Sequence, residues 1–192
     1  MAGGQSRRMG FDKQLLQIGG LRLIYHIIAQ LSRSFDDVLV VTRHPELYEE
    51  LPVRVTEDII PGRGPLSGIH AALSESTSEY IYAVACDMPN FNEAYCQHMM
   101  QRLEEQPSDA CVTRFGSWIE PFHAFYGRAL IPTLEERLYG DNTSVHRLLD
   151  ESDTLFVAEA EARIFTPDWS LFFNLNTREK IEEYLHLLRK QS

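Results

Sequence analysis

Hydrophobic positions along the chain follow two alternating patterns. In residues 22–34, apolar side chains recur every three or four positions and leave the opposite face polar, which predicts a helix. The β-branched run at 38–41 is too short for a buried helix and is typical of a strand covered on both faces. Further strands are expected at 53–56, 80–85, 110–113, 172–175 and around Val157, with extended chain at 121–126. Helices are expected at 67–73, 93–103, 130–138, 144–149 and after Thr177 through Leu188. Strands that alternate with helices predict an α/β three-layer sandwich on a mainly parallel sheet.

The length of the chain bears on its domain organisation. One hydrophobic core suits 192 residues, whereas two full-sized domains would need a longer chain. The composition, 44% apolar and 24% charged, is that of a folded globular protein. Because the sequence also shows no internal repeat, low-complexity tract or long linker, we expect a single domain over residues 1–192.

Charge and cysteine content narrow the range of partners and compartments. A net charge of −10 disfavours a broad binding surface for nucleic acid or for an anionic membrane, because both need an excess of Lys and Arg. Any anionic ligand must therefore meet a local basic patch. Three cysteines without a C-x-x-C pair suit neither a disulfide framework nor a zinc site, and they favour the reducing cytoplasm. No segment has the roughly 18 apolar residues of a membrane span, and the polar start does not suit a signal peptide.

A basic patch of this kind lies at the start of the chain. Residues 2–13 read A-G-G-Q-S-R-R-M-G-F-D-K and contain three glycines and three basic side chains. Glycines let successive N–H groups approach phosphate oxygens closely, while Arg and Lys supply formal charge. The segment matches neither a Walker A loop nor a G-x-G-x-x-G fingerprint. It therefore predicts a phosphate site of another kind, and the alternative is a surface turn whose basic residues are only solvated.

Asp87 carries the second chemical signal. It follows the apolar run 80–85, and open α/β sheets bind their ligands outside the carboxyl ends of strands. A carboxylate there suits Mg²⁺, which takes one or two protein carboxylates and completes its shell with water and phosphate oxygens. The alternative interpretation is an Asp that begins a turn before Pro89.

These segments together resemble one protein family. The opening segment closely matches the pattern L-A-G-G-x-S-R-R-M-G-x-D-K of the molybdenum cofactor guanylyltransferases. Three later segments look like further motifs of that family in the same order: E-D at 57–58 with G-P-L-S-G at 64–68, C-D-M-P at 86–89, and N-L-N-T at 174–177. The matches cover nearly the whole chain, and four ordered motifs are more specific than any one of them.

The resemblance implies an enzyme that transfers GMP from Mg-GTP to molybdopterin bearing molybdenum, which gives the guanine dinucleotide cofactor and pyrophosphate. It implies a Rossmann-like nucleotidyltransferase fold, Mg²⁺ as cofactor, and GTP and molybdenum-bearing molybdopterin as partners. Other molybdenum cofactor biosynthesis proteins and client molybdoenzymes are further candidate partners. Nucleic acids and membranes are not expected among them.

The resemblance also assigns roles to single residues. Five residues of the opening segment would hold the triphosphate: Ala2, Gly3, Gly4, Arg8 and Lys13. Asp87 would bind Mg²⁺ together with the nucleotide. Catalysis would rest on Arg8 and Lys13, which would stabilise charge on the α-phosphate and on the leaving pyrophosphate, and on Asp87, whose Mg²⁺ would neutralise the same charge.

Four more residues would complete the two substrate sites. By the resemblance, Asp58 and Gly68 would help to hold the nucleotide, whereas Asn174 and Asn176 would face the pterin. Each also has an explanation that needs no ligand. Asp58 would be an acid at the end of a strand, and Gly68 would be part of a helix start. Asn174 and Asn176 would be neighbours of a helix cap at Thr177.

One departure from the family pattern concerns the fold. The family has a buried strand directly before the A-G-G segment, whereas here Met1 stands where that strand would end. The sheet would then lack its usual first strand, unless the true start lies upstream. In addition, Thr42 follows a strand after which family members often present an Asn to the nucleotide.

Two other functions remain compatible with these residues. A CTP-dependent relative or a sugar-phosphate nucleotidyltransferase would share a glycine-rich loop with a basic end. A non-catalytic accessory protein would bind the nucleotide or cofactor and hand it to a molybdoenzyme. Comparing GTP with CTP binding tests the first alternative, and pyrophosphate release tests the second.

Overall fold

The computed structural model describes residues 1–2, 13–18, 20–140 and 142–191, without the side chains of Lys13 and of residues 189–191. Its strands are β1 (Gln17–Ile18), β2 (Leu21–Arg22), β3 (Leu39–Val41), β4 (Arg54–Thr56), β5 (Tyr80–Ala83), β6 (Ala110–Phe115), β7 (Trp118–Gly127) and β8 (Thr154–Ala158). Its α-helices are α1 (Leu23–Leu31), α2 (Pro65–Glu75), α3 (Glu93–Glu105), α4 (Ile131–Tyr139), α5 (Val145–Glu151), α6 (Glu159–Phe165) and α7 (Arg178–Gln191). Short 3₁₀ turns complete the described elements: η1 (Lys13–Leu15), η2 (Pro45–Leu47), η3 (Arg128–Leu130) and η4 (Ser170–Phe172).

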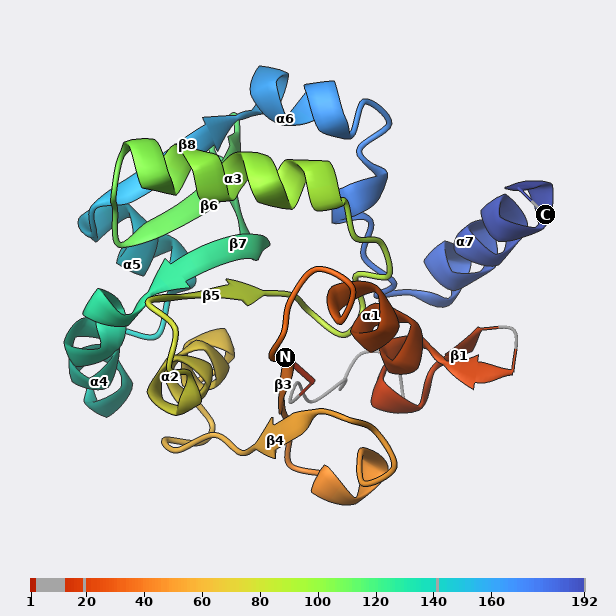
Figure 1. Cartoon of the computed structure of the whole chain (residues 1–192), viewed down its shortest axis with the longest axis horizontal. Coiled ribbons are helices and arrows are strands. Elements are labelled where there is room, and N and C mark those ends of the chain that lie inside the picture. Colours follow the sequence, from red (N-terminus) through yellow and green to blue (C-terminus); the bar gives the residue numbers. More distant parts are fainter. Residues whose placement is uncertain (3–12, 19, 141, 192) are drawn as a thin grey trace.

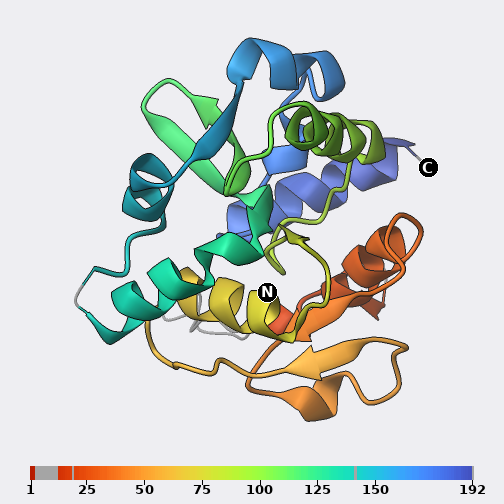
Figure 2. The same ribbon diagram turned by 60° about the vertical axis from the view of Figure 1, so that its left-hand side comes forward.

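The helices cover both faces of the strands, which confirms the α/β three-layer sandwich (Figures 1 and 2). Apolar side chains of α2, α4 and α5 form one core with Ala110 and Val112 of β6. Cys111, between those two residues, points to the other face and packs with α3 and α6. This alternation is that of a strand buried on both faces.

The strands pair in a mixed pattern, which corrects the expectation of a mainly parallel sheet. β3 pairs with β4 in parallel, and β6 pairs with β8 in parallel. However, β7 runs antiparallel to both β5 and β6. The cause is local: two residues join β6 to β7, Gly116 among them has a φ of 59°, and a turn this short can join only antiparallel strands.

The last third of the chain differs most from the sequence-based expectation. Residues 172–175 do not form a strand: η4 ends at Phe172 and the chain continues as a loop. Leu171 and Phe172 are apolar because they pack against α3 and the sheet, which a pattern alone cannot distinguish from a buried strand. The final helix is confirmed, and its cap is Thr177, whose Oγ1 accepts from the Lys180 N–H at 3.3 Å.

Candidate active site

Both described ends of the glycine-rich segment are fastened to the carboxyl end of β3. The Ala2 N–H donates to the Val41 carbonyl oxygen at 2.9 Å. At the other end, the buried Gln14 side chain accepts hydrogen bonds from the Thr42 hydroxyl at 2.7 Å and from the Tyr48 hydroxyl at 2.9 Å. Thr42, directly after β3, is thus a buried residue that anchors the segment. Gln14 and Tyr48 are site-forming residues that the sequence patterns did not reveal.

Most of the triphosphate residues proposed from the resemblance lie outside the described part of the chain. These are Gly3, Gly4, Arg8 and the side chain of Lys13. Ala2 is described and almost fully buried, with 1% of its surface exposed. The structure therefore describes only the two ends of the segment, at Ala2 and from Lys13 onward. The proposed phosphate chemistry of the segment rests on the sequence.

Asp87 lies in a turn beyond the carboxyl end of β5, as the sequence predicts. The Met88 N–H donates to the Ala85 carbonyl oxygen at 3.1 Å, which closes the turn. The Asp87 carbonyl oxygen accepts from the Leu175 N–H at 2.8 Å, and the residue is only 7% exposed. Asp87 is thus held on a turn that is pinned from a distant part of the chain.

The same hydrogen bond brings Asn174 beside the Asp87 turn. The Asn174 side-chain oxygen is buried and has no hydrogen-bond partner in the described structure. Asn176 differs, because its side chain is exposed at the approach to α7 and its N–H donates to the Asn174 carbonyl oxygen at 3.0 Å. Of the two asparagines, only Asn174 presents a buried oxygen that lacks a partner.

Asp58, which follows β4, and Gly68, in α2, lie next to each other. A side-chain carbon on Gly68 would stand 3.7 Å from the Asp58 Oδ1 atom and would clash with the Met1 Cε atom. Partial burial raises the pKa of Asp58, the positive charge of Arg43 opposes this shift, and the charge of Glu57 adds to it. The space that Gly68 leaves beside the Asp58 carboxyl group is therefore taken up by the Met1 side chain.

A bulge in β7 contributes groups that the sequence patterns did not identify. The pairing of β6 with β7 shifts register between Cys111 and Thr113, opposite residues 121–124 of β7. Within this bulge His123 has a φ of 51° and is fully buried, and its Nδ1 lies 3.1 Å from the Tyr82 hydroxyl. Burial lowers the pKa of His123 to about 3, so the ring is neutral near pH 7. The one available signal was Pro121, because proline inside a strand often marks a bulge.

Glu120, directly before this bulge, is a second carboxyl group close enough to sense Asp87. Burial raises the pKa of Glu120 to about 7, hydrogen bonds from Phe122 and Trp118 oppose that shift, and the charge of Asp87 adds to it. The Phe122 N–H donates to the Glu120 Oε1 atom at 3.2 Å. This carboxyl group therefore changes charge within the physiological pH range.

The donor set near Asp87 fits a hard divalent cation. Within the described residues, no three His, Cys, Asp or Glu side chains converge on a common point. The carboxylate at this turn is that of Asp87, and the main chain beside it carries Asn174, whose side-chain oxygen has no partner in the described structure. A cation held by so few protein oxygens must take its other ligands from water or phosphate, as Mg²⁺ does and as structural zinc does not.

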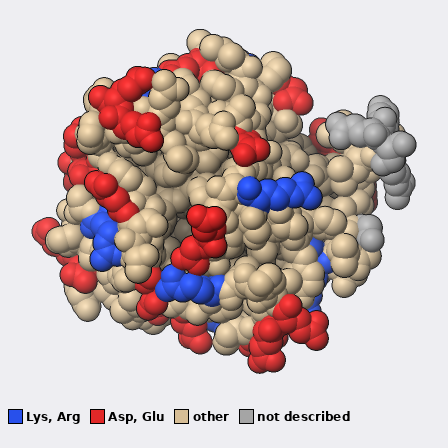
Figure 3. Space-filling view, viewed as in Figure 1, with Lys and Arg blue, Asp and Glu red and all other residues tan. Residues whose placement is uncertain are grey.

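The described surface is consistent with the overall negative charge. On the face seen in Figure 3, Lys and Arg side chains stand scattered among Asp and Glu and form no continuous basic stripe among the described residues. In the part of the chain that is described, no helix combines the length and the apolar character needed to cross a bilayer.

The amino-acid sequence matches a family model and is similar to two named relatives. Residues 1–155 match the family model of the MobA-like NTP transferase domain. A molybdenum cofactor guanylyltransferase from Syntrophotalea carbinolica is 50% identical over 184 residues, which cover 96% of this chain and 88% of the relative. A protein from Peptoclostridium acidaminophilum, named as a probable molybdenum cofactor guanylyltransferase, is 44% identical over 196 residues, covering 100% of this chain and 89% of the relative.

A solved structure shares the fold. It is molybdopterin-guanine dinucleotide biosynthesis protein A from Archaeoglobus fulgidus, which is 24% identical and superposes with a TM-score of 0.88 over 98% of this chain and 96% of that chain. The family match covers well over half of the chain, and the two relatives align along nearly all of it. The chain belongs to the MobA-like NTP transferase family.

Proposed function

We propose that the chain is a molybdenum cofactor guanylyltransferase, which transfers GMP from GTP to molybdopterin bearing molybdenum and releases pyrophosphate. The observation that carries this proposal is that two strand ends lie together. Both ends of the glycine-rich segment, at Ala2 and Gln14, are fastened beside the carboxyl end of β3, and Met1 bonds to Val84 and Cys86, directly before the Asp87 turn that follows β5. Two relatives with 44% and 50% identity bear this name. GTP and molybdopterin are therefore the proposed substrates.

The proposed chemistry needs positioning and charge rather than a covalent intermediate. An oxygen of the molybdopterin phosphate forms a bond to the α-phosphorus of GTP, while the bond from that phosphorus to the β-phosphate oxygen breaks and pyrophosphate leaves. The acceptor phosphate is already a nucleophile near pH 7, so no residue needs to be modified. In this proposal Arg8 and Lys13 stabilise the charge that develops, and Gly3 and Gly4 bring main-chain N–H groups to the triphosphate. Ala2, whose own N–H is bonded to Val41, holds the start of the segment in place beside the nucleotide.

We further propose Mg²⁺ as the metal and Asp87 as its protein ligand. When bound, Mg²⁺ would supply positive charge that offsets the phosphate oxygens during transfer. Asp87 suits this role because its turn is pinned by the Leu175 N–H, so the carboxyl group does not need to be ordered when the nucleotide binds.

The remaining site residues divide between the two substrates. We propose that Asp58 and Gly68 contact the nucleotide, since the two lie beside each other: a side-chain carbon on Gly68 would stand 3.7 Å from the Asp58 Oδ1 atom. We propose that Asn174 and Asn176 contact the pterin. Amide groups both donate and accept hydrogen bonds, which suits a polar heterocycle, and the Asn174 oxygen has no partner within the described structure.

We also propose that residues 1–192 act as one domain in the cytoplasm. Support for the single domain comes from the contact between Leu175 and Asp87, which ties the segment after residue 155 to the site. Support for a reducing compartment comes from Cys86, Cys96 and Cys111, which are buried and have reduced thiol groups.

The test is nucleotide-dependent pyrophosphate release from the purified chain with Mg²⁺ and molybdenum-bearing molybdopterin. We expect GTP to support release and CTP not to, and calorimetry should show the same preference in binding. Asp87→Ala and Lys13→Ala should each lower turnover by about 100-fold or more with the fold retained. Glu104→Gln and Arg33→Ala, at exposed positions, are the matched controls. Full turnover in either site variant, or equal release with CTP, would overturn the proposal.

A further inference from the structure

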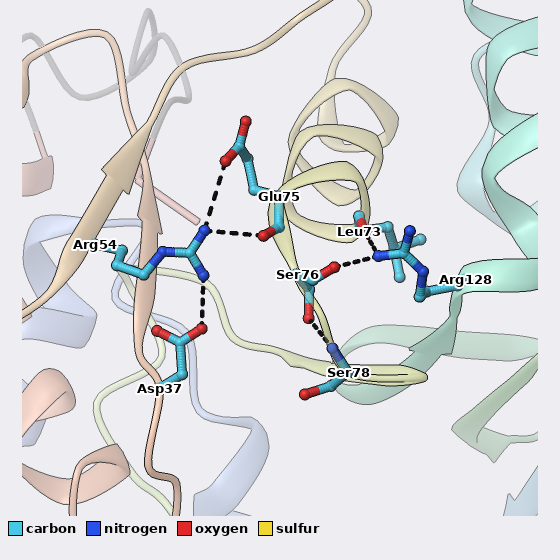
Figure 4. A network of polar contacts seen from close by, with 7 residues as sticks. All are labelled: Asp37, Arg54, Leu73, Glu75, Ser76, Ser78 and Arg128. Atoms are coloured by element: carbon cyan, nitrogen blue, oxygen red, sulfur yellow. Dashed lines mark hydrogen bonds and ion pairs between the residues drawn. The ribbon is translucent and has the colours of Figure 1, made fainter.

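The charged groups at the amino ends of β3, β4 and β5 are engaged in contacts within the protein. Arg54 donates to the Asp37 Oδ2 atom at 2.8 Å and to the Glu75 carbonyl oxygen at 2.9 Å (Figure 4). Arg128 donates to two further carbonyl oxygens at the end of α2. Because carbonyl groups at a helix end lack partners within the helix, these guanidinium groups stabilise α2. The proposed substrate site lies at the opposite end of β5, beside Asp87.

An exposed tryptophan stands at the tip of the strand next to β5. Trp118 is the first residue of β7, it pairs with Phe115 across the two-residue turn from β6, and 50% of its surface is exposed. Tryptophan is usually well buried, because its ring removes a large apolar area from water. Trp118 therefore presents an aromatic surface to solvent from a strand rather than from a flexible loop.

Three contacts of different kinds fix the orientation of the Trp118 ring. Its indole N–H, the one hydrogen-bond donor of this side chain, bonds to the Glu120 carboxyl group. The His146 ring of α5 meets it at an interplanar angle of 69°, with the ring centroids 4.9 Å apart, and the Phe115 ring lies at 6.4 Å. An aromatic ring that is oriented in advance loses little conformational freedom when a planar ligand stacks on it.

Trp118 and Asp87 lie beyond the same end of one strand pair. Ala83, the last residue of β5, pairs with Ala124 of β7 in an antiparallel ladder. The chain after Ala83 leads to Asp87, and β7 followed backward from Ala124 leads to Glu120 and then to Trp118. Burial is the main cause of the raised pKa of Glu120, and the added effect of the Asp87 charge agrees with this placement.

The residues proposed to hold the nucleotide lie on the other side of β5. One edge of β5 pairs with β7, whereas Met1 and Ala2 connect the chain after β5 to the end of β3. β3 pairs in turn with β4, which leads to Asp58, and Asp58 lies beside Gly68. Trp118 is therefore separated from the proposed nucleotide residues by the strand that carries Asp87.

A row of aromatic rings connects Trp118 to the segment proposed to contact the pterin. The Phe115 ring packs at 5.3 Å from the Trp169 ring, which packs at 4.9 Å from the Phe172 ring. Phe172 stands two residues before Asn174, whose buried side-chain oxygen has no partner in the described structure. Trp118 thus lies on the acceptor side of Asp87.

We propose that Trp118 is a stacking platform for the pterin ring of the acceptor. This inference rests on the proposed function, because it identifies where one of the two proposed substrates binds. The pyrimidine part of a pterin is planar and polar at its edge, so an indole can cover its face while Asn174 bonds to its edge. Trp118 is a binding residue in this assignment, and it positions the acceptor phosphate relative to Asp87.

The test measures binding of the two substrates separately by calorimetry, with molybdenum-bearing molybdopterin in one titration and Mg-GTP in the other. Trp118→Ala should weaken molybdopterin binding about 10-fold or more, because it removes the stacking surface, and should leave GTP binding unchanged. Trp118→Phe keeps an aromatic face and should retain most of the affinity. Trp118→Leu keeps apolar bulk without that face and should behave like Trp118→Ala. Tyr139→Ala removes another exposed aromatic ring, on α4, and is the matched control.

Tryptophan fluorescence provides a second readout that a purely structural role would not alter. The chain has two tryptophans, Trp118 and Trp169. Stacked molybdopterin should quench the parent protein strongly. Trp118→Phe should lose most of this quenching even though it still binds the ligand.

Several outcomes would contradict the assignment. If Trp118→Ala or Trp118→Leu folds and binds molybdopterin as tightly as the parent protein, stacking on Trp118 is excluded. If Trp118→Ala weakens only GTP binding, the ring contacts guanine instead and the assignment is wrong. If the parent protein binds molybdopterin but does not release pyrophosphate from GTP, the proposed function fails while the platform is still tested by the same titrations. If the parent protein binds neither substrate, both are wrong.

Discussion

The carboxyl group of Glu120 allows a quantitative test of the geometry around the β7 bulge. Its raised pKa arises mainly from burial, with a smaller contribution from the negative charge of Asp87. Because the pKa in the folded state exceeds the usual value of 4.5, folding favours the protonated form. The stabilising contribution is fully present below pH 4.5 and is lost as the pH rises through about 7.

The size of the effect follows from the two pKa values. For a carboxyl group whose pKa moves from 4.5 to about 7, the free energy of unfolding falls by about 2.5 kcal/mol between pH 5 and pH 8. Glu120→Gln keeps an oxygen that can accept from the Phe122 N–H but cannot ionise, so its stability should lack this fall. Urea unfolding of both proteins at about pH 5 and about pH 8 measures the difference.

A matched control separates this effect from general acid behaviour. Glu104→Gln removes an exposed carboxyl group on α3 and should follow the pH dependence of the parent protein. Asp87→Asn should reduce the dependence only slightly, because burial is the larger cause of the shift. If the parent and Glu120→Gln give parallel stability curves, then Glu120 is not buried as described and the geometry of the bulge is wrong.

Three further expectations concern the core and the anchor of the glycine-rich segment. Gln14→Ala leaves two buried hydroxyl groups without their acceptor and should lower the free energy of unfolding by about 2–4 kcal/mol, measured in urea. Leu134→Ala in the fully buried core should cost about 2–5 kcal/mol in the same assay, whereas Tyr139→Ala, 76% exposed, should change stability by less than about 0.5 kcal/mol. Burial raises the thiol pKa of Cys96 and Cys111 to about 12, so both should resist a thiol reagent until the protein unfolds, which peptide mapping can follow.

The local pattern of hydrophobic residues was sufficient to predict those helices and strands that are buried in the same way along their whole length. The helix that begins at Pro65 and the strand at Tyr80–Ala83 were expected within a few residues of their observed bounds, because periodic apolar positions report which faces are covered. Strand direction was not predictable in this way. It depended on the two-residue turn at Gly116, which the sequence pattern did not single out and which forces β7 to run antiparallel to β6.

The candidate site shows the same division between local and distant causes. Asp87 was expected because its place after a buried strand is a local property. Gln14 and Glu120 were not, since the environment of each depends on residues far away in sequence: Gln14 meets Tyr48, and Glu120 senses Asp87. Motifs in a single sequence indicate which residues have reactive or ligand-binding side chains. The burial that shifts the pKa of such a side chain depends on the folded structure around it.

Met1 and Ala2 anchor the start of the glycine-rich segment between two parts of the fold. The Met1 amine and carbonyl oxygen bond to Val84 and Cys86 after β5, and the Ala2 N–H bonds to Val41 at the end of β3. Because these bonds fix the first residues of the segment from both sides, its start has less conformational freedom to lose when a triphosphate binds. The contacts that join β3 to the end of β5 therefore also preorganise the start of the proposed nucleotide site.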